Sequence, residues 1–170
     1  MMLQKLQKIA RSRWYWLFMA ALGIAFIAVA LYYQYVLEEL PCVLCIQTRI
    51  WFSCLVIVAL IAFIIPGRTI RLVAHFLTIV IFAGLLERAY MLLGTERGFV
   101  FSDCGFDLGL PAWLALDQWF PVMYRVEASC GHTPVLAFGI TMAEALIVLS
   151  AILLLTSLMF TIVTCLRQDH

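Results

Sequence analysis

Four long apolar stretches, separated by short polar segments, make up most of the chain. They cover residues 14–33, 44–65, 70–93 and 143–165. Each is about 20 residues or longer, which is the length a helix needs to cross a bilayer. Tryptophan and tyrosine residues stand at the two ends of the first stretch, as is typical where helices meet membrane interfaces. The pattern predicts an all-α integral membrane protein built as a four-transmembrane-helix bundle.

Composition supports a membrane location for the whole chain. Hydrophobic residues make up 65% of it, charged residues only 12%, and the mean hydropathy is +1.05, far more apolar than an ordinary soluble domain. We expect a single membrane domain, 1–170, with the lipid bilayer as a partner and no nucleic acid. A cleaved signal peptide ending near residues 28–30 is the alternative for the first stretch, but that stretch is long and aromatic at its ends.

Basic residues are distributed unevenly among the polar segments. Seven of the eleven Lys and Arg residues lie in three of these segments. They are the N-terminal arm (1–13), the connection at 66–69 with Arg71 just beyond it, and the tail (166–170). The same segments hold only one of the ten acidic residues. Cytoplasmic segments of membrane proteins carry such an excess of positive charge. We therefore expect both termini and this connection to be cytoplasmic.

Four of the six cysteines lie on the predicted outer side, in the turn at 34–43, at the helix mouth beside it and in the loop at 94–142. These are Cys42, Cys45, Cys104 and Cys130. Disulfides persist on the oxidising outer side of a membrane. Cys54 and Cys165 lie deeper or at the cytoplasmic end, and we expect them to pack as small apolar residues.

Cys42 and Cys45 form a C-x-x-C pair at the mouth of the second stretch. If the helix begins near residue 43, Cys45 lies in its first turn, where unpaired N–H groups and the helix dipole stabilise a thiolate. Arg49 follows four residues later on the same face and adds a fixed positive charge. It either snorkels to the surface or binds a polar head group.

The four outer cysteines allow three kinds of site. A four-thiolate zinc site is disfavoured because Cys104 and Cys130 do not form a second C-x-x-C, and we expect no metal. Structural disulfides and redox-active disulfides remain. An arginine near the hydrocarbon costs roughly 2.5–3.5 kcal/mol at mid-depth. This cost favours redox-active disulfides over purely structural ones.

One protein family combines four such stretches with the Pro41–Cys45 motif, Arg49 and single loop cysteines. In these features the chain resembles the DsbB family of bacterial disulfide bond formation proteins. The likeness extends to Leu116–Pro121 and Phe138–Ile140 and covers essentially the whole chain. It implies a quinone-dependent protein-disulfide oxidoreductase of the bacterial inner membrane, with cytoplasmic termini and periplasmic redox cysteines.

The resemblance implies a relay of electrons through four catalytic cysteines. A DsbA-like periplasmic thioredoxin-fold protein would attack the Cys104–Cys130 disulfide and form a mixed disulfide with Cys104. Cys130 would pass the exchange to Cys42–Cys45, and the Cys45 thiolate beside Arg49 would reduce a membrane quinone, ubiquinone or menaquinone. A quinone suits a partner as oxidising as DsbA, at about −120 mV, whereas a glutathione-like acceptor is too reducing.

Two positions depart from the family pattern near the expected quinone site. Thr48 stands where an acidic residue is common, and no histidine lies near the outer end of the third stretch. Arg88 stands there instead, and it either contacts the quinone head group or pairs with Glu87 or Glu144. His132 either assists the neighbouring loop thiolate or is simply solvated.

A short helix is expected over Pro111–Phe120 in the outer loop, lying in the membrane interface or against the top of the bundle. Its apolar side would carry Trp113, Leu116 and Phe120. Two alternatives to the relay remain. One is a vitamin K epoxide reductase-like enzyme of similar architecture, and the other is a non-enzymatic membrane protein with two structural disulfides.

Overall fold

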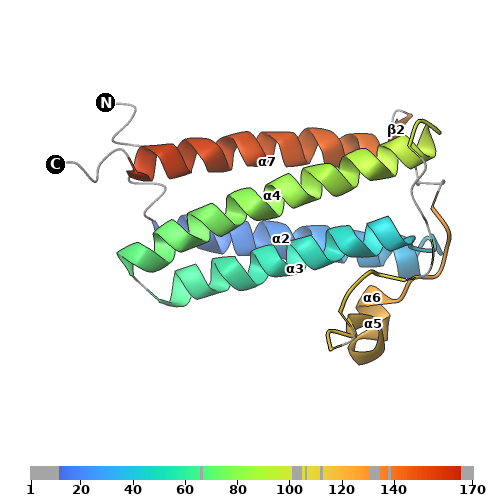
Figure 1. The fold of residues 1–170 in the computed structure, drawn as a ribbon, viewed down its shortest axis with the longest axis horizontal. Coiled ribbons are helices and arrows are strands. Elements are labelled where there is room, and N and C mark those ends of the chain that lie inside the picture. Colours follow the sequence, from blue (N-terminus) through green and yellow to red (C-terminus); the bar gives the residue numbers. More distant parts are fainter. Residues whose placement is uncertain are drawn as a thin grey trace.

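Four long helices form the body of the described part of the molecule (Figure 1). The computed structural model describes residues 12–65, 67–100, 105, 107–111, 113–130, 135–137 and 139–165. The helices are α2 (Arg13–Tyr35), α3 (Val43–Ile64), α4 (Arg68–Glu96) and α7 (Met142–Cys165). Each is long and apolar enough to cross a membrane. The predicted all-α four-helix membrane bundle is confirmed.

Helix α4 is longer than the apolar pattern predicts. The sequence predicts an end at residue 93, but the helix continues to Glu96. The chain then folds back, so that the N–H groups of Phe99 and Val100 donate to the Gly94 carbonyl at 3.0 and 3.1 Å. A Cβ atom at Gly94 would lie 2.4 Å from Val100, and Gly98 reverses the chain at φ = 74°.

Packing follows the order of the chain, with α2 against α3, α3 against α4, and α4 against α7. Glycines allow two of these contacts to be close, as is common between membrane helices. A Cβ atom at Gly23 would lie 2.7 Å from Val56, and one at Gly84 would lie 2.4 Å from Trp51. Contact between α2 and α7 is much less extensive.

The two ends of the bundle differ. The end with Cys42, here called the thiol end, carries the turn between α2 and α3 and the segment between α4 and α7 (Figure 1). The opposite end, where α2 begins and α7 ends, buries a polar cluster of Tyr15, Trp16, His75, Thr78 and Ser157. The Thr78 hydroxyl donates to the His75 carbonyl at 2.8 Å and accepts from Ser157 at 2.9 Å. This last bond joins α4 to α7.

The described part of the segment between α4 and α7 contains two helical turns and a small hairpin. These are α5 (Leu116–Trp119), α6 (Pro121–Tyr124), and strand β1 (Val135–Ala137) paired antiparallel with β2 (Ile140–Thr141). The bounds predicted for the loop helix are wrong, since it begins only at Leu116. Pro121 disfavours helical backbone at Phe120, which adopts φ = −133° and ψ = 65°, and so splits the segment into two turns.

Candidate active site at the mouth of α3

Cys42 and Cys45 begin helix α3, which puts Cys45 in the first turn as the sequence predicts. Cys42 is the N-cap residue in an extended conformation, and its sulfur accepts a hydrogen bond from the Cys45 N–H at 3.4 Å. The two sulfur atoms lie 2.7 Å apart. Because a disulfide bond is about 2.05 Å long, little movement is needed for the pair to close.

The segment before Cys130 is held against this helix start by backbone hydrogen bonds. The N–H groups of Glu127 and Ala128 both donate to the Pro41 carbonyl, at 3.0 and 3.2 Å. Ala128 also pairs with Cys42 as a parallel bridge. A side-chain hydrogen bond then joins Cys130 to Cys42. Three of the four cysteines predicted to be catalytic therefore meet at one point.

The two thiols of the C-x-x-C pair have different surroundings. Cys42 is only 2% exposed. A hydrogen bond with Cys130 lowers the pKa of the Cys42 thiol, but the hydrogen bond with Cys45 and burial raise it, and the resulting pKa is about 12. Cys42 therefore keeps its proton at neutral pH, whereas Cys45 borders a cavity.

The other predicted cysteines and His132 have varied positions. Cys104 and His132 lie outside the described residues. Within the described part of the chain, no group of three or more His, Cys, Asp or Glu side chains is arranged to hold a metal ion. Cys54 is half-buried against the core. Cys165 is exposed, so its predicted packing is wrong, because it is the last residue of α7.

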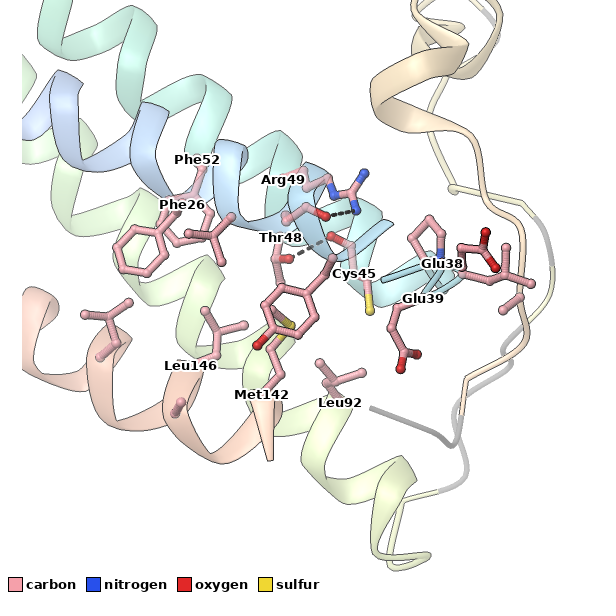
Figure 2. Close-up of a pocket in the computed structure, with 18 of the residues that line it drawn as sticks. Phe26, Glu38, Glu39, Cys45, Thr48, Arg49, Phe52, Leu92, Met142 and Leu146 are labelled. Carbon is pink, nitrogen blue, oxygen red and sulfur yellow. Dashed lines mark hydrogen bonds between the residues drawn. The ribbon is translucent and has the colours of Figure 1, made fainter. Parts of the chain in front are cut away.

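A cavity of about 460 Å³ opens beside Cys45 between α2, α3 and α7 (Figure 2). It lies where α2 and α7 have little contact with each other. Residues 38–41, Ala128 and Ser129 close it at the thiol end. Its other walls are mostly apolar and are formed by Phe26, Val29, Ala30, Tyr33, Thr48, Arg49, Phe52, Leu92, Met142, Ala145, Leu146 and Leu149. The volume is within the roughly 300–1,000 Å³ of small-molecule sites.

Arg49 is buried at the edge of this cavity, with 5% of its surface exposed. Its guanidinium donates to Gln34 Oε1 at 2.6 Å and to the carbonyls of Ala30 and Met123 at 3.1 and 3.2 Å. The Nε atom has no hydrogen-bond partner among the described residues. The side chain does not snorkel to the surface. The alternative, binding of a polar group in the cavity, is compatible with this position (Figure 2).

Gln34 and Glu127 belong to the site, although neither is among the site residues predicted above. Gln34 Nε2 donates to Glu127 Oε2 at 3.2 Å, so Arg49, Gln34 and Glu127 link α3, α2 and the loop in one hydrogen-bonded chain. Gln34 is the first polar residue after the 14–33 stretch and lies buried in the last turn of α2. A polar side chain directly beyond an apolar stretch is the signal that identifies it.

Arg88 is not among the described residues that line the cavity. Its guanidinium pairs with Glu87 at 2.7 Å and donates to Gln47 Oε1 at 3.0 Å. Gln47 in turn donates to a loop carbonyl at 3.1 Å. Glu144, the other predicted partner, pairs with Arg97 instead. Of the two predicted roles, the structure contains the pairing with Glu87, which lies within α4. The bond from Arg88 to Gln47 is the one that ties α4 to α3.

Comparison with known proteins identifies the family of this chain. The family model described as Disulfide bond formation protein DsbB matches residues 12–160. The chain belongs to the DsbB family. It is 32% identical over 157 residues to Disulfide bond formation protein B of Shewanella sp. (strain MR-4), covering 91% of this chain and 90% of that relative. The protein of the same name from Shewanella amazonensis is 32% identical over 162 residues, covering 94% of this chain and 96% of that relative. The one from Haemophilus influenzae is 30% identical over 175 residues, covering 99% of this chain and 98% of that relative.

Membership in the DsbB family makes this chain a multi-pass membrane protein of disulfide bond formation with a disulfide oxidoreductase role. Disulfide exchange needs thiols in contact with one another. Among the described residues, the cluster of Cys42, Cys45 and Cys130 meets this need.

Proposed function

We propose that this DsbB-family protein is a thiol oxidase that takes electrons from a DsbA-like periplasmic dithiol protein and passes them to a membrane quinone. The observation that carries the proposal is the line of Cys130, Cys42 and Cys45, which leads from the loop to the cavity. One end of this line belongs to a segment that a protein partner can approach. The other end borders a space suited to a small molecule.

Electrons would enter through the loop cysteines. A thiolate of the reduced partner attacks the Cys104–Cys130 disulfide at Cys104, releasing Cys130 as a thiolate, and the second thiolate of the partner then resolves the mixed disulfide. Cys130 attacks Cys42, the sulfur that it contacts, and releases Cys45 as a thiolate. Attack of Cys104 on Cys130 restores the loop disulfide and leaves Cys42 and Cys45 as a dithiol.

The electrons would leave through the cavity. Oxidation of the Cys42–Cys45 dithiol gives two electrons and two protons to the quinone, which yields a disulfide and a quinol. The apolar walls suit the ring and tail of a quinone, and Phe26 and Phe52 stack with their ring centroids 4.9 Å apart beside this space. Arg49 would donate to a carbonyl oxygen that ubiquinone and menaquinone both possess. We assign Arg88 no contact with the quinone.

The proposed location is the bacterial inner membrane, with both termini cytoplasmic and the redox cysteines periplasmic. Two features support this orientation. The excess of Lys and Arg falls before and at the start of α2, at the start of α4, and after α7. Helix α2 begins, α3 ends, α4 begins and α7 ends at one end of the bundle, opposite the thiol end (Figure 1).

The test is quinone reduction by the purified protein, with a reduced DsbA-type protein as the electron donor. We expect the wild type to consume quinone and expect Cys45→Ala and Cys104→Ala each to lower the rate to background. Cys54→Ala, at a half-buried thiol in the core, is the control for the loss of a cysteine. Wild-type protein that consumes no quinone with a competent donor overturns the proposal and favours two structural disulfides.

A further inference from the structure

Two acidic residues, Glu38 and Glu39, stand in the turn that closes the cavity at the thiol end. In Figure 2 the Glu39 side chain extends into the space beside the Cys45 thiol, whereas the Glu38 side chain points away from it. Glu39 is half-buried and Glu38 is exposed. Neither carboxylate forms a hydrogen bond or an ion pair with another described residue. Glu39 therefore presents to the cavity a carboxylate that no described residue binds.

The backbone of the turn determines which acid faces the cavity. Glu38 adopts φ = 57°, in the left-handed region that few residues other than glycine occupy. The next N–H group, that of Glu39, donates to the Tyr33 carbonyl at 3.1 Å and closes the turn on the end of α2. This reversal directs the two neighbouring side chains to different sides.

Oxidation of the Cys42–Cys45 dithiol has to release a proton that Cys42 holds firmly. Burial and the bond with Cys45 outweigh the opposing hydrogen bond with Cys130 and raise the pKa of Cys42 to about 12. A base must therefore accept this proton when the disulfide forms at neutral pH. The Cys42 sulfur contacts the Cys45 sulfur at 2.7 Å, and Cys45 borders the cavity, so the base is expected on the cavity side.

Few described residues of the cavity can serve as that base. The charged or titratable ones are Tyr33, Glu38, Glu39, Cys45 and Arg49. Arg49 stays protonated, and the phenol of Tyr33 is a poor proton acceptor. The wall formed by α7 contributes only Met, Ala and Leu side chains. Glu127, an acid of the described part of the loop segment, is already bonded to Gln34.

We propose that the Glu39 carboxylate is the proton acceptor of the dithiol oxidation, a role that rests on the proposed quinone reduction. In the balanced step, two S–H bonds break, one S–S bond forms, and two electrons pass to the quinone. Both protons end on the two quinol oxygens. Glu39 carries one of them from the thiols to an oxygen and is ionised again when the quinol leaves.

The test compares Glu39→Gln and Glu39→Asp with Glu38→Gln in the full-length membrane protein. Dithiothreitol serves as the donor and a short-chain ubiquinone as the acceptor, so that no protein partner is needed. Glu39→Gln is expected to lower the rate about tenfold or more at neutral pH, since a positioned acid or base contributes roughly 10²–10⁴-fold. The lost rate should return at alkaline pH, where hydroxide removes the proton. Glu39→Asp should retain part of the rate, and Glu38→Gln should keep the shape of the wild-type pH profile.

The pH profile separates proton transfer from other roles of Glu39. A Glu39→Gln protein with the wild-type rate and profile overturns the inference. A rate lowered equally at every pH also overturns it, because loss of binding or packing has that effect. Thermal unfolding and the number of reactive thiols check that each variant is folded. A wild type that reduces no quinone with dithiothreitol overturns the proposed function itself, so the two failures are distinguished.

Discussion

The two ends of the bundle bury polar side chains in different settings. At the thiol end, Arg49 and Cys45 border a cavity, and Arg49 and Cys42 are hydrogen-bonded to the loop. At the opposite end, the polar cluster is closed in by packing, and the bond between Thr78 and Ser157 joins two helices. A buried polar group in a membrane bundle can thus take part in a reaction where it borders a cavity. Where it is fully enclosed by packing, it can instead stabilise the contact between helices. We expect changes at the first end to alter rates and changes at the second to alter stability.

Cys42→Ser is expected to show the largest separation between rate and stability. Serine is a preferred N-cap residue, so the start of α3 should be retained when the sulfur is lost. Quinone reduction should fall to background while the thermal unfolding temperature stays close to that of the wild type. Both quantities are measured on the same preparation. Residual quinone reduction would mean that electrons reach Cys45 without Cys42.

Arg49→Met should have the next largest effect and should lower both the rate of quinone reduction and the thermal stability. Loss of a positioned donor lowers rates by roughly a hundredfold or more in other enzymes. It also strands the Gln34 oxygen and two carbonyls, at a cost of about 1–3 kcal/mol for each buried group left unsatisfied. The matched change Arg88→Met removes a partly exposed ion pair and should alter the rate less than about twofold. Equal losses at the two arginines would contradict the assignment of Arg49 alone to the cavity.

Particular residues show how far the sequence could predict this molecule. The helices follow from the length of each apolar stretch, and Cys42 and Cys45 follow from their spacing at a helix start. The contact between Cys42 and Cys130 could not be predicted from spacing, because it depends on backbone bonds from Glu127 and Ala128 to Pro41. Such bonds involve no side chains and leave no local pattern. The place of Gln34 likewise depends on which way the last turn of α2 faces.

Thr78→Val and Ser157→Ala test the opposite end. Each change should lower the free energy of unfolding by about 0.6–1.7 kcal/mol, the range for hydrogen bonds between membrane helices, and leave quinone reduction unchanged. Because both variants break the same bond, the double variant should lose less than the sum of the single losses. Unfolding in mixed detergents measures the three values. Strictly additive losses would indicate that the bond between the two hydroxyls contributes nothing.

The smallest predicted effect needs no substitution. It concerns how the ionisation and alkylation of the Cys42 thiol depend on pH. Its pKa is about 12 in the folded protein, above its ordinary value of 9.0. The stability contributed by the neutral thiol is full below the unfolded pKa and is lost as pH rises through the folded pKa. In the reduced, folded protein, Cys42 should therefore resist iodoacetamide at mildly alkaline pH, where the denatured chain reacts. Mass spectrometry of the peptides measures this, with the exposed Cys165 as internal reference. Equal rates for the two thiols would contradict the prediction.

The pairing of Glu127 and Ala128 with Pro41 bears on how the loop can change in length during evolution. One residue, Ser129, separates the paired Ala128 from Cys130, so the backbone register sets where the thiol points. An insertion between α4 and Glu127 lengthens the connection and leaves that register intact. An insertion at Ser129 turns the thiol away, since successive residues of an extended segment face opposite sides. The loop can therefore grow or shrink before Glu127, whereas the stretch from Glu127 to Cys130 has a fixed length.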